Sequence, residues 1–219
     1  MSHSDMTTVA PRMSECDITR IVGMARWEPD AAGRLREAAM QLYVERGFDQ
    51  TTVADIAERA GVTSRTFFRH FTDKREVLFN GTDLLRTGIA EALAGAPADT
   101  SPIATVALAL ESTTGFVGRD HAHSVRRQRI IDAHAELRER ELIKMADLGA
   151  ALAAGLRERG VPEPDATLAA ETGIVAFRVA FASWIADPSP GLLSLIRSTL
   201  ARLTALTASG RSGQVEGRP

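Results

Sequence analysis

The side chains best suited to chemistry lie between residues 51 and 74, where threonines, arginines and a histidine are interleaved with three phenylalanines. If this stretch is helical, Arg65, Thr66 and Arg69 fall on or near one outer face. Guanidinium and hydroxyl groups of this kind bind base edges and phosphates. The sequence contains no nucleophile elbow, phosphate-cradling glycine loop or zinc-protease motif. The pattern therefore favours binding of a nucleic acid, and no enzymatic activity is expected.

Two short helices joined by a tight turn would hold these side chains in place. Thr52 is a good N-cap for the first helix, and Asp55 follows in its first turn. Apolar residues then recur at the helical spacing i, i+3, i+4 and i+7, namely Val53, Ile56, Ala57 and Ala60. Gly61 is expected to end this helix with a positive φ.

The second helix is expected over residues 64–71, with Thr63 as its cap. Phe67 and Phe71, four positions apart, would point inward. Between positions 64 and 75 the basic residues outnumber the single acidic one, Asp73; they are Arg65, Arg69, Lys74 and Arg75. A helix–turn–helix is built in this way so that its second helix can enter a DNA major groove.

Together these features resemble the DNA-binding domain of the TetR family of transcriptional regulators. The matching segments are residues 45–48 (ERGF), 51–57 (TTVADIA), 60–63 (AGVT), 67–71 (FFRHF) and the pair Asp73-Lys74. The resemblance covers roughly residues 31–91. It departs at Phe67-Phe68, where the family more often has Leu-Tyr, so Phe68 lacks a phenolic hydroxyl that could reach a phosphate.

The resemblance implies a sequence-specific regulator, most simply a repressor that a small apolar ligand releases from a pseudo-palindromic double-stranded DNA operator. Lys74, expected at the start of the next helix, would hold the phosphate backbone, and Thr52 is placed for a phosphate at a helix N-terminus. The expected DNA-binding residues are Thr52, Thr63, Ser64, Arg65, Thr66, Phe68, Arg69, His70 and Lys74.

Length and composition agree with this interpretation. The chain has 219 residues, enough for one compact domain or two small ones, and 44% apolar residues exclude a largely disordered chain. A net charge of −2 gives no global basic field. Cys16 is the single cysteine, so no intrachain disulfide is possible and a cytoplasmic location is expected. No run of 18 apolar residues occurs, so no membrane span is expected.

The periodicity predicts an all-α protein of about nine or ten helices. A three-helix DNA-binding domain is expected over residues 29–91, with its helix–turn–helix at 52–71, and an effector-binding and dimerisation bundle over 92–207. Residues 1–28 and 208–219 are expected to be largely disordered. The remaining helices are expected at 31–46, from 73 to 95 as one helix weakened by Gly81 and Gly88, and at 101–118, 121–136, 137–159, 165–186 and 191–207.

The last two expected helices are apolar nearly all round, so each must be buried in a core or against a partner. In the TetR family the last two helices of each chain pack into a four-helix dimer interface. The resemblance therefore implies a homodimer formed through Leu192, Leu195, Ile196, Thr199 and Leu203. The alternative is that both helices fill only the core of a monomer.

The middle of the chain is expected to bind the effector. Residues 121–131 and 135–140 are similar to the C-terminal domain of TetR members of the mycofactocin-regulator type, which respond to acyl-CoA thioesters. Arg126, Arg127 and Arg129 could hold phosphates near the mouth of an apolar tunnel. As an alternative, they form a solvated face paired with Glu136, Glu139 and Glu141. The expected walls of the apolar cavity are Leu110, Phe116, Met145, Leu148, Phe177, Phe181 and Trp184.

The spacing of the histidines argues against a metal site. His121 and His123 are two positions apart, so on a helix they would point about 200° away from each other, and neither a metal site nor a cofactor is expected. The alternative to a regulator is a helical small-molecule-binding or interaction module that keeps the fold without operator binding. The capped and basic second helix of the helix–turn–helix favours the regulator.

Overall fold

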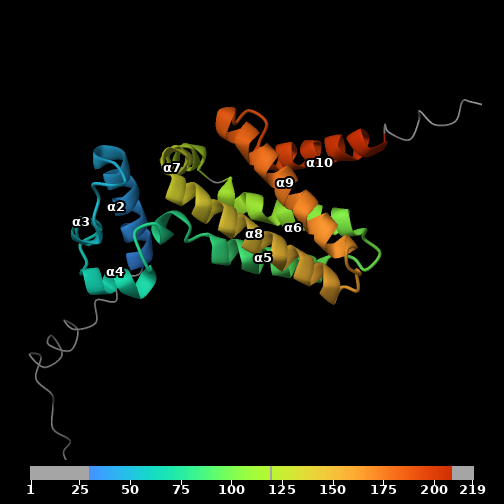
Figure 1. Ribbon diagram of the computed structural model, residues 1–219, viewed down its shortest axis with the longest axis horizontal. Coiled ribbons are helices and arrows are strands. Elements are labelled where there is room, and N and C mark those ends of the chain that lie inside the picture. The colour runs from blue at the N-terminus through green and yellow to red at the C-terminus, as the bar shows by residue number, and fades with distance from the viewer. Residues whose placement is uncertain (1–29, 119, 209–219) are drawn as a thin grey trace, which may run out of the picture.

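The computed structural model describes residues 30–118 and 120–208 (Figure 1). Within these residues the chain forms nine α-helices and one short 3₁₀ helix and has no strand, which confirms the predicted all-α fold. The helices are α2 (Ala31–Arg46), α3 (Val53–Arg59), α4 (Ser64–His70), η1 (Glu76–Leu78), α5 (Thr82–Gly95), α6 (Pro102–Val117), α7 (His121–Ala133), α8 (Ala135–Glu158), α9 (Asp165–Ala186) and α10 (Leu192–Ala208). The predicted N-terminal arm and the tail beyond residue 208 lie outside the described residues.

The helices are arranged in two lobes (Figure 1). The N-terminal lobe consists of α2, α3 and α4, while α5, α6, α8, α9 and α10 pack into a larger bundle. Helix α7 packs on α2 as well as on α8 and α9, so it lies between the lobes. The domain boundary expected after residue 91 falls inside α5, whose Ile89 and Leu93 belong to the bundle core.

The core of the N-terminal lobe extends into the second half of the chain. Phe48, Ile56 and Phe67 are fully buried in it, and Ile131 of α7 and Leu137 of α8 belong to the same cluster. Close-packed interiors transmit displacement between the elements that share them. The corner between α7 and α8 is therefore mechanically part of the N-terminal lobe.

The connection between the lobes differs from the single helix predicted from residue 73 to 95. The Asp73 carboxylate accepts a hydrogen bond from the Glu76 amide at 2.9 Å, and only the short η1 follows. The chain then turns, with the Thr82 hydroxyl donating to the Phe79 carbonyl at 2.7 Å, before α5 begins. Gly81 lies in this turn against the ring of Phe116, which would have to move to admit a Cβ atom, since that atom would lie 2.5 Å from it.

The other helices lie close to their predicted positions. Pro102 opens α6, and the predicted helix at 165–186 matches α9. The break between α7 and α8 falls at His134, whose φ of −125° and ψ of 120° are extended, rather than at residues 136–137. The His134 ring hydrogen-bonds the Ile130 carbonyl through Nδ1 at 2.8 Å, which stabilises this corner.

Helix α9 is long and apolar enough, by length and composition alone, to cross a membrane, with a mean hydropathy of 1.4 over its most apolar window. Its contacts indicate a core helix instead, because it packs on α6, α8 and α10 within the bundle. Ala170, Ala180 and Trp184 are buried there.

Candidate nucleic-acid interface

Helix α3 begins with a capping box. The Thr52 side chain accepts a hydrogen bond from the Asp55 amide at 3.2 Å, and the Asp55 carboxylate accepts one from the Thr52 amide at 2.8 Å. Hydrogen bonds from Thr52 hold the pKa of Asp55 below its usual range. After α3, Gly61 has a φ of 69°, as the sequence predicted for the turn. The turn and the helix before it are thus specified by local chemistry.

Helix α4 presents a polar outer face because its aromatic residues point inward. Thr63 caps the helix by accepting from the Thr66 amide at 3.2 Å. Phe67 is completely buried, and its ring lies 5.4 Å from that of Phe71, centroid to centroid. Phe68 is the exception, since 58% of it remains exposed.

The predicted contact residues of α4 are mostly free to meet a ligand. Ser64, Arg65, Arg69 and His70 are exposed, and neither arginine makes a hydrogen bond or an ion pair with any described residue. Thr66 is half-buried, with its hydroxyl 3.1 Å from that of Thr63. This face therefore carries two unpaired guanidinium groups and no acidic side chain.

Lys74 has a different role from the one expected. Its ammonium group donates to the carbonyls of Phe48, Asp49 and Thr51, at 2.8, 3.3 and 2.9 Å. It also lies 4.4 Å from the centre of the Phe48 ring. Because its three protons are directed at the loop before α3, Lys74 fixes that loop and is not free for a phosphate. Nor does it begin a helix, since the chain at this point forms the connection to η1.

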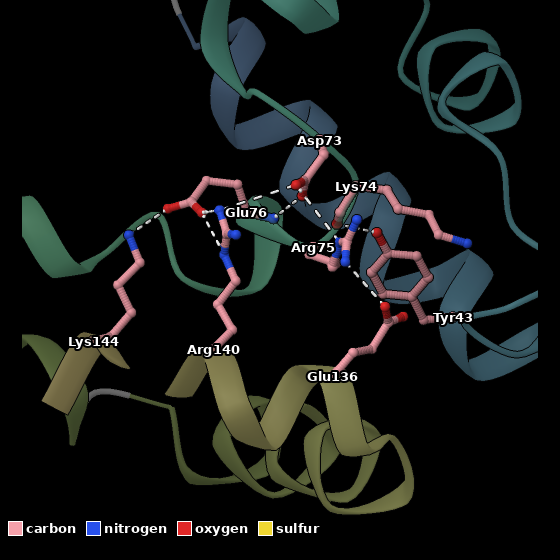
Figure 2. A network of polar contacts seen from close by, with 8 residues as sticks. All are labelled: Tyr43, Asp73, Lys74, Arg75, Glu76, Glu136, Arg140 and Lys144. Atoms are coloured by element: carbon pink, nitrogen blue, oxygen red, sulfur yellow. Dashed lines mark hydrogen bonds and ion pairs between the residues drawn. The ribbon is translucent and has the colours of Figure 1, made fainter. Parts of the chain in front are cut away.

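A polar network joins this connection to α8 (Figure 2). The Glu76 carboxylate accepts hydrogen bonds from Lys144, at 2.7 Å, and from Arg140. Burial would raise the pKa of Glu76, but the hydrogen bonds and charges of Lys144 and Arg140 outweigh it and hold the pKa below its ordinary value. A second pair, Arg75 with Glu136 at 3.0 Å, lies beside it.

Tyr43 ties α2 to the same connection (Figure 2). Its hydroxyl donates to the Lys74 carbonyl at 2.6 Å. Burial, and then the negative charge of Asp73, raise the pKa of Tyr43, so the hydroxyl keeps its proton and remains a donor. The connection is therefore held by the N-terminal lobe on one side and by α8 on the other.

Arg127, one of the predicted phosphate contacts, makes its hydrogen bonds at this junction. Its Nε atom donates to the Leu78 carbonyl at 2.7 Å, and its Nη1 atom to Glu141 at 3.1 Å. The guanidinium lies 5.1 Å from the centre of the Phe79 ring. Burial lowers the pKa of Arg127, and Glu141 opposes that shift. Arg126 and Arg129, by contrast, are exposed and have no ion pair with a described residue.

The expected cavity walls lie in one region, with one exception. Leu110, Leu148, Phe177 and Trp184 belong to the bundle core, and Met145 and Phe181 pack against it. The rings of Phe177 and Phe181 are stacked, 5.8 Å apart. Phe116 is 43% exposed and lies against Gly81, so the structure places it outside this group.

The expected dimer residues fall into a buried group and a half-buried group. Leu192 and Ile196 are buried in the core of their own bundle, which removes them from any surface. Leu195, Thr199 and Leu203 are half-buried. Exposed apolar residues of this region lie on both helices: Leu168, Val175 and Val179 of α9 are 62%, 54% and 52% exposed, and Leu193 and Leu206 of α10 are 37% and 68% exposed.

Residues 35–80, which run from α2 through α4 and η1, match the family model for bacterial regulatory proteins of the tetR family. The chain therefore carries a TetR-family DNA-binding domain over these residues. Among curated relatives, the HTH-type transcriptional regulator TcmR of Streptomyces glaucescens is 34% identical to this chain over 84 residues, which are 38% of this chain and 37% of that protein. The matched segments thus span about two-fifths or less of the curated relatives' length.

Solved structures extend the likeness to the bundle. Thermus thermophilus FadR, a TetR-family transcriptional repressor in complex with lauroyl-CoA, superposes with a TM-score of 0.51 at 25% identity and covers 86% of this chain and 98% of its own. Bacillus subtilis FadR in complex with stearoyl-CoA gives a TM-score of 0.53 at 22% identity, over 78% of this chain and 96% of its own. These matches confirm the two-part TetR fold.

Several structural residues were not identified from the sequence. Arg140 and Lys144 are four positions apart and share a helix face, which the sequence could have indicated. Their partner Glu76 is more than sixty residues earlier, and no local pattern pairs them. Separately, no cluster of three or more potential metal ligands occurs among residues 30–118 and 120–208.

Proposed function

We propose that this protein is a TetR-family transcriptional regulator that binds double-stranded DNA through α4. The observation that carries the proposal is the outer face of that helix, where Arg65 and Arg69 are exposed without ion partners and without a neighbouring acidic side chain. An unpaired guanidinium can donate two hydrogen bonds to a guanine edge or to phosphate at little cost. Such a protein would work in the cytoplasm, where its operator lies.

Repression is the mode of control that we favour. Thermus thermophilus FadR, which shares the fold over most of this chain, is a repressor. A small molecule would then release the protein from its operator. The FadR complex contains lauroyl-CoA, which supports an acyl-CoA or a similar flexible apolar molecule as the ligand here. The aromatic and aliphatic side chains around Phe177 and Trp184 in the bundle are suited to an acyl chain.

The regulator is proposed to act as a homodimer. Two copies would present two α4 helices about one turn of DNA apart, roughly 34–36 Å, on a pseudo-palindromic site. Leu168, Val175 and Val179 lie on the exposed side of α9, at helical spacing, and this surface remains uncovered within the chain. A solvent-facing apolar stripe of this length is suited to a second copy of the same helix.

A mobility-shift experiment tests the proposal directly. The full chain is titrated onto the intergenic DNA beside its own gene, with an unrelated fragment of equal length as competitor. We expect a specific shift that survives the competitor at moderate salt. Binding that the competitor abolishes, or no binding, would favour the alternative, a helical module that has kept the fold without operator recognition.

A further inference from the structure

The surface between the two lobes is hollowed where the C-terminal end of α2 meets α7. The hollow has a volume of about 440 Å³, within the range of small-molecule sites. Arg46, Val44 and Asp49 line it from the N-terminal lobe, and Arg126, Arg129 and Ile130 line it from α7. It is separate from the aromatic core of the bundle around Phe177 and Trp184.

The charges in this hollow are not balanced. Arg126 and Arg129 are exposed and have no ion pair with any described residue. Arg46 lies 3.9 Å from Asp55, a distant pair. The carboxylate of Asp49 is the one acidic group in the lining, and it lies 3.7 Å from the His134 ring. Guanidinium groups left unpaired in a concave surface favour an anion.

Apolar side chains line the hollow too, together with the polar groups of Tyr43, Gln50 and His134. Val44 is 59% exposed although it lies on a helix whose neighbours Leu42 and Tyr43 are buried. Ile130, which is 9% exposed, and Ala133 line the same hollow from α7, and Phe48 lines it from the N-terminal lobe. An apolar side chain in a concave surface loses contact with water when a ligand covers it, which stabilises the bound state.

We propose that this hollow binds an amphipathic anion, whose phosphate or carboxylate head contacts Arg126 and Arg129 and whose short apolar part covers Val44 and Ile130. The ligand would touch α2 and α7 at once. Because Ile131, one residue further along α7, belongs to the N-terminal core, occupancy would fix the position of α7 against that lobe. This last step, in which binding alters DNA affinity, rests on the proposed function, whereas binding itself does not.

The test uses hexyl phosphate as the probe, with hexanol and inorganic phosphate as its two halves. Methyl resonances of Val44 and Ile130 are followed by NMR during each titration of the full chain without DNA. We expect saturable shifts of both methyl groups with hexyl phosphate, and at least tenfold weaker binding of either half. Arg126→Ala and Arg129→Ala should each weaken binding of hexyl phosphate at least fivefold, with Arg129→Lys intermediate.

The control is Arg157→Ala, at the far end of α8, which should bind hexyl phosphate as the wild type does. Equal affinity of the wild type and both alanine variants would overturn the site, as would shifts confined to methyl groups of the bundle core. If Arg126→Ala and Arg129→Ala weakened DNA binding but not hexyl phosphate binding, the arginines would belong to the DNA interface and this proposal would be wrong. Since the titration contains no DNA, a negative result would not contradict the proposed DNA binding, which the mobility-shift experiment tests separately.

Discussion

Among single residues, Arg65 and Arg69 on α4 are the ones whose chemistry is least used within the protein. Replacing either by Ala should cost about 1–3 kcal/mol of operator affinity if it contacts a base, and should relax the sequence preference at one position. Folding should be unaffected, because neither side chain has a partner among the described residues. Binding isotherms on operator variants measure this, with Arg157→Ala as the control. Unchanged affinity for both variants would remove α4 from the interface.

Lys74 gives the opposite prediction. Its ammonium group donates to three carbonyls of the loop before α3, so Lys74→Met should destabilise the protein. Hydrogen bonds to a charged group contribute about 1.5–3 kcal/mol, and a loss of that size is expected in urea unfolding. Arg69→Met is the matched variant, since it removes a positive charge without these contacts. A stable Lys74→Met protein whose DNA binding merely lost salt dependence would restore the phosphate role that the sequence suggested.

The roles of single residues were predictable from the sequence where their partners are close along the chain, and not where the partners are distant. Caps such as Thr52 and turns such as Gly61 are decided by neighbours within a few positions, so both were predictable. Lys74 lies in the register of a family motif, but its partners are carbonyl groups more than twenty residues away. Every residue has a backbone carbonyl group, so no sequence pattern indicates which of them accept the hydrogen bonds of Lys74.

Among elements, the connection between α4 and α5 is held by ionic contacts whose strength depends on pH. The pKa of Glu76 is depressed in the folded protein, so the carboxylate stabilises the fold above its ordinary pKa of about 4.5. That stabilisation is lost as the pH falls through the folded value. Glu76→Gln should therefore lower stability near neutral pH, by roughly 1 kcal/mol as for other partly exposed pairs, and the difference should vanish in acid.

Urea unfolding of both proteins between pH 7 and pH 3 measures this effect. Glu139→Gln serves as the control, because Glu139 is exposed and forms no ion pair with a described residue. If the free energies of unfolding of the wild type and Glu76→Gln differed by the same amount at every pH, the charge of Glu76 would not contribute to stability through Lys144 and Arg140.

The same connection shows why some elements were predictable and one was not. Helix α6 begins at Pro102, and α9 shows a long apolar periodicity. The bounds of both helices therefore follow from local signals in the sequence. The chain breaks before α5 next to Gly81, which packs against the ring of Phe116. Gly81 was visible as a weak point in a helix, but the aromatic ring that packs against it lies 35 positions further along the chain.

At the scale of the whole molecule, dimerisation should depend on α9 more than on the α10 residues named from the sequence. Leu192 and Ile196 are apolar and periodic, but they fill the core of their own bundle, and amphipathicity alone does not say which neighbour a helix meets. Val175→Asp should shift a dimer to monomers in sedimentation at micromolar concentration, because a carboxylate would be buried unpaired in the interface. Ile143→Asp on α8 removes a side chain of nearly equal exposure, 55%, and should leave the dimer intact. Equal effects of the two substitutions would exclude α9 as the specific interface.

Regulation requires that the ligand and the operator prefer different arrangements of the two lobes. The lobes meet through the Glu76 contacts, the Arg127 bridge and the core shared with α7, so a displacement in the bundle has a direct path to α4. A ligand shifts this equilibrium only as far as its affinities for the two arrangements differ. Thermodynamic linkage then requires the operator to weaken ligand binding by the same factor by which the ligand weakens operator binding, typically about 5–150-fold.

This reciprocity can be measured with lauroyl-CoA, the ligand of the structurally similar Thermus protein. Its affinity for the full chain is determined with and without a saturating operator fragment, and the operator affinity with and without saturating lauroyl-CoA. We expect equal factors in the two directions. In the Glu76→Gln variant both factors should shrink together, because a loosened connection couples the lobes less strongly while each site keeps its own contacts. Ligand affinity that is the same with and without operator would separate ligand binding from DNA release, and the lobes would then act independently.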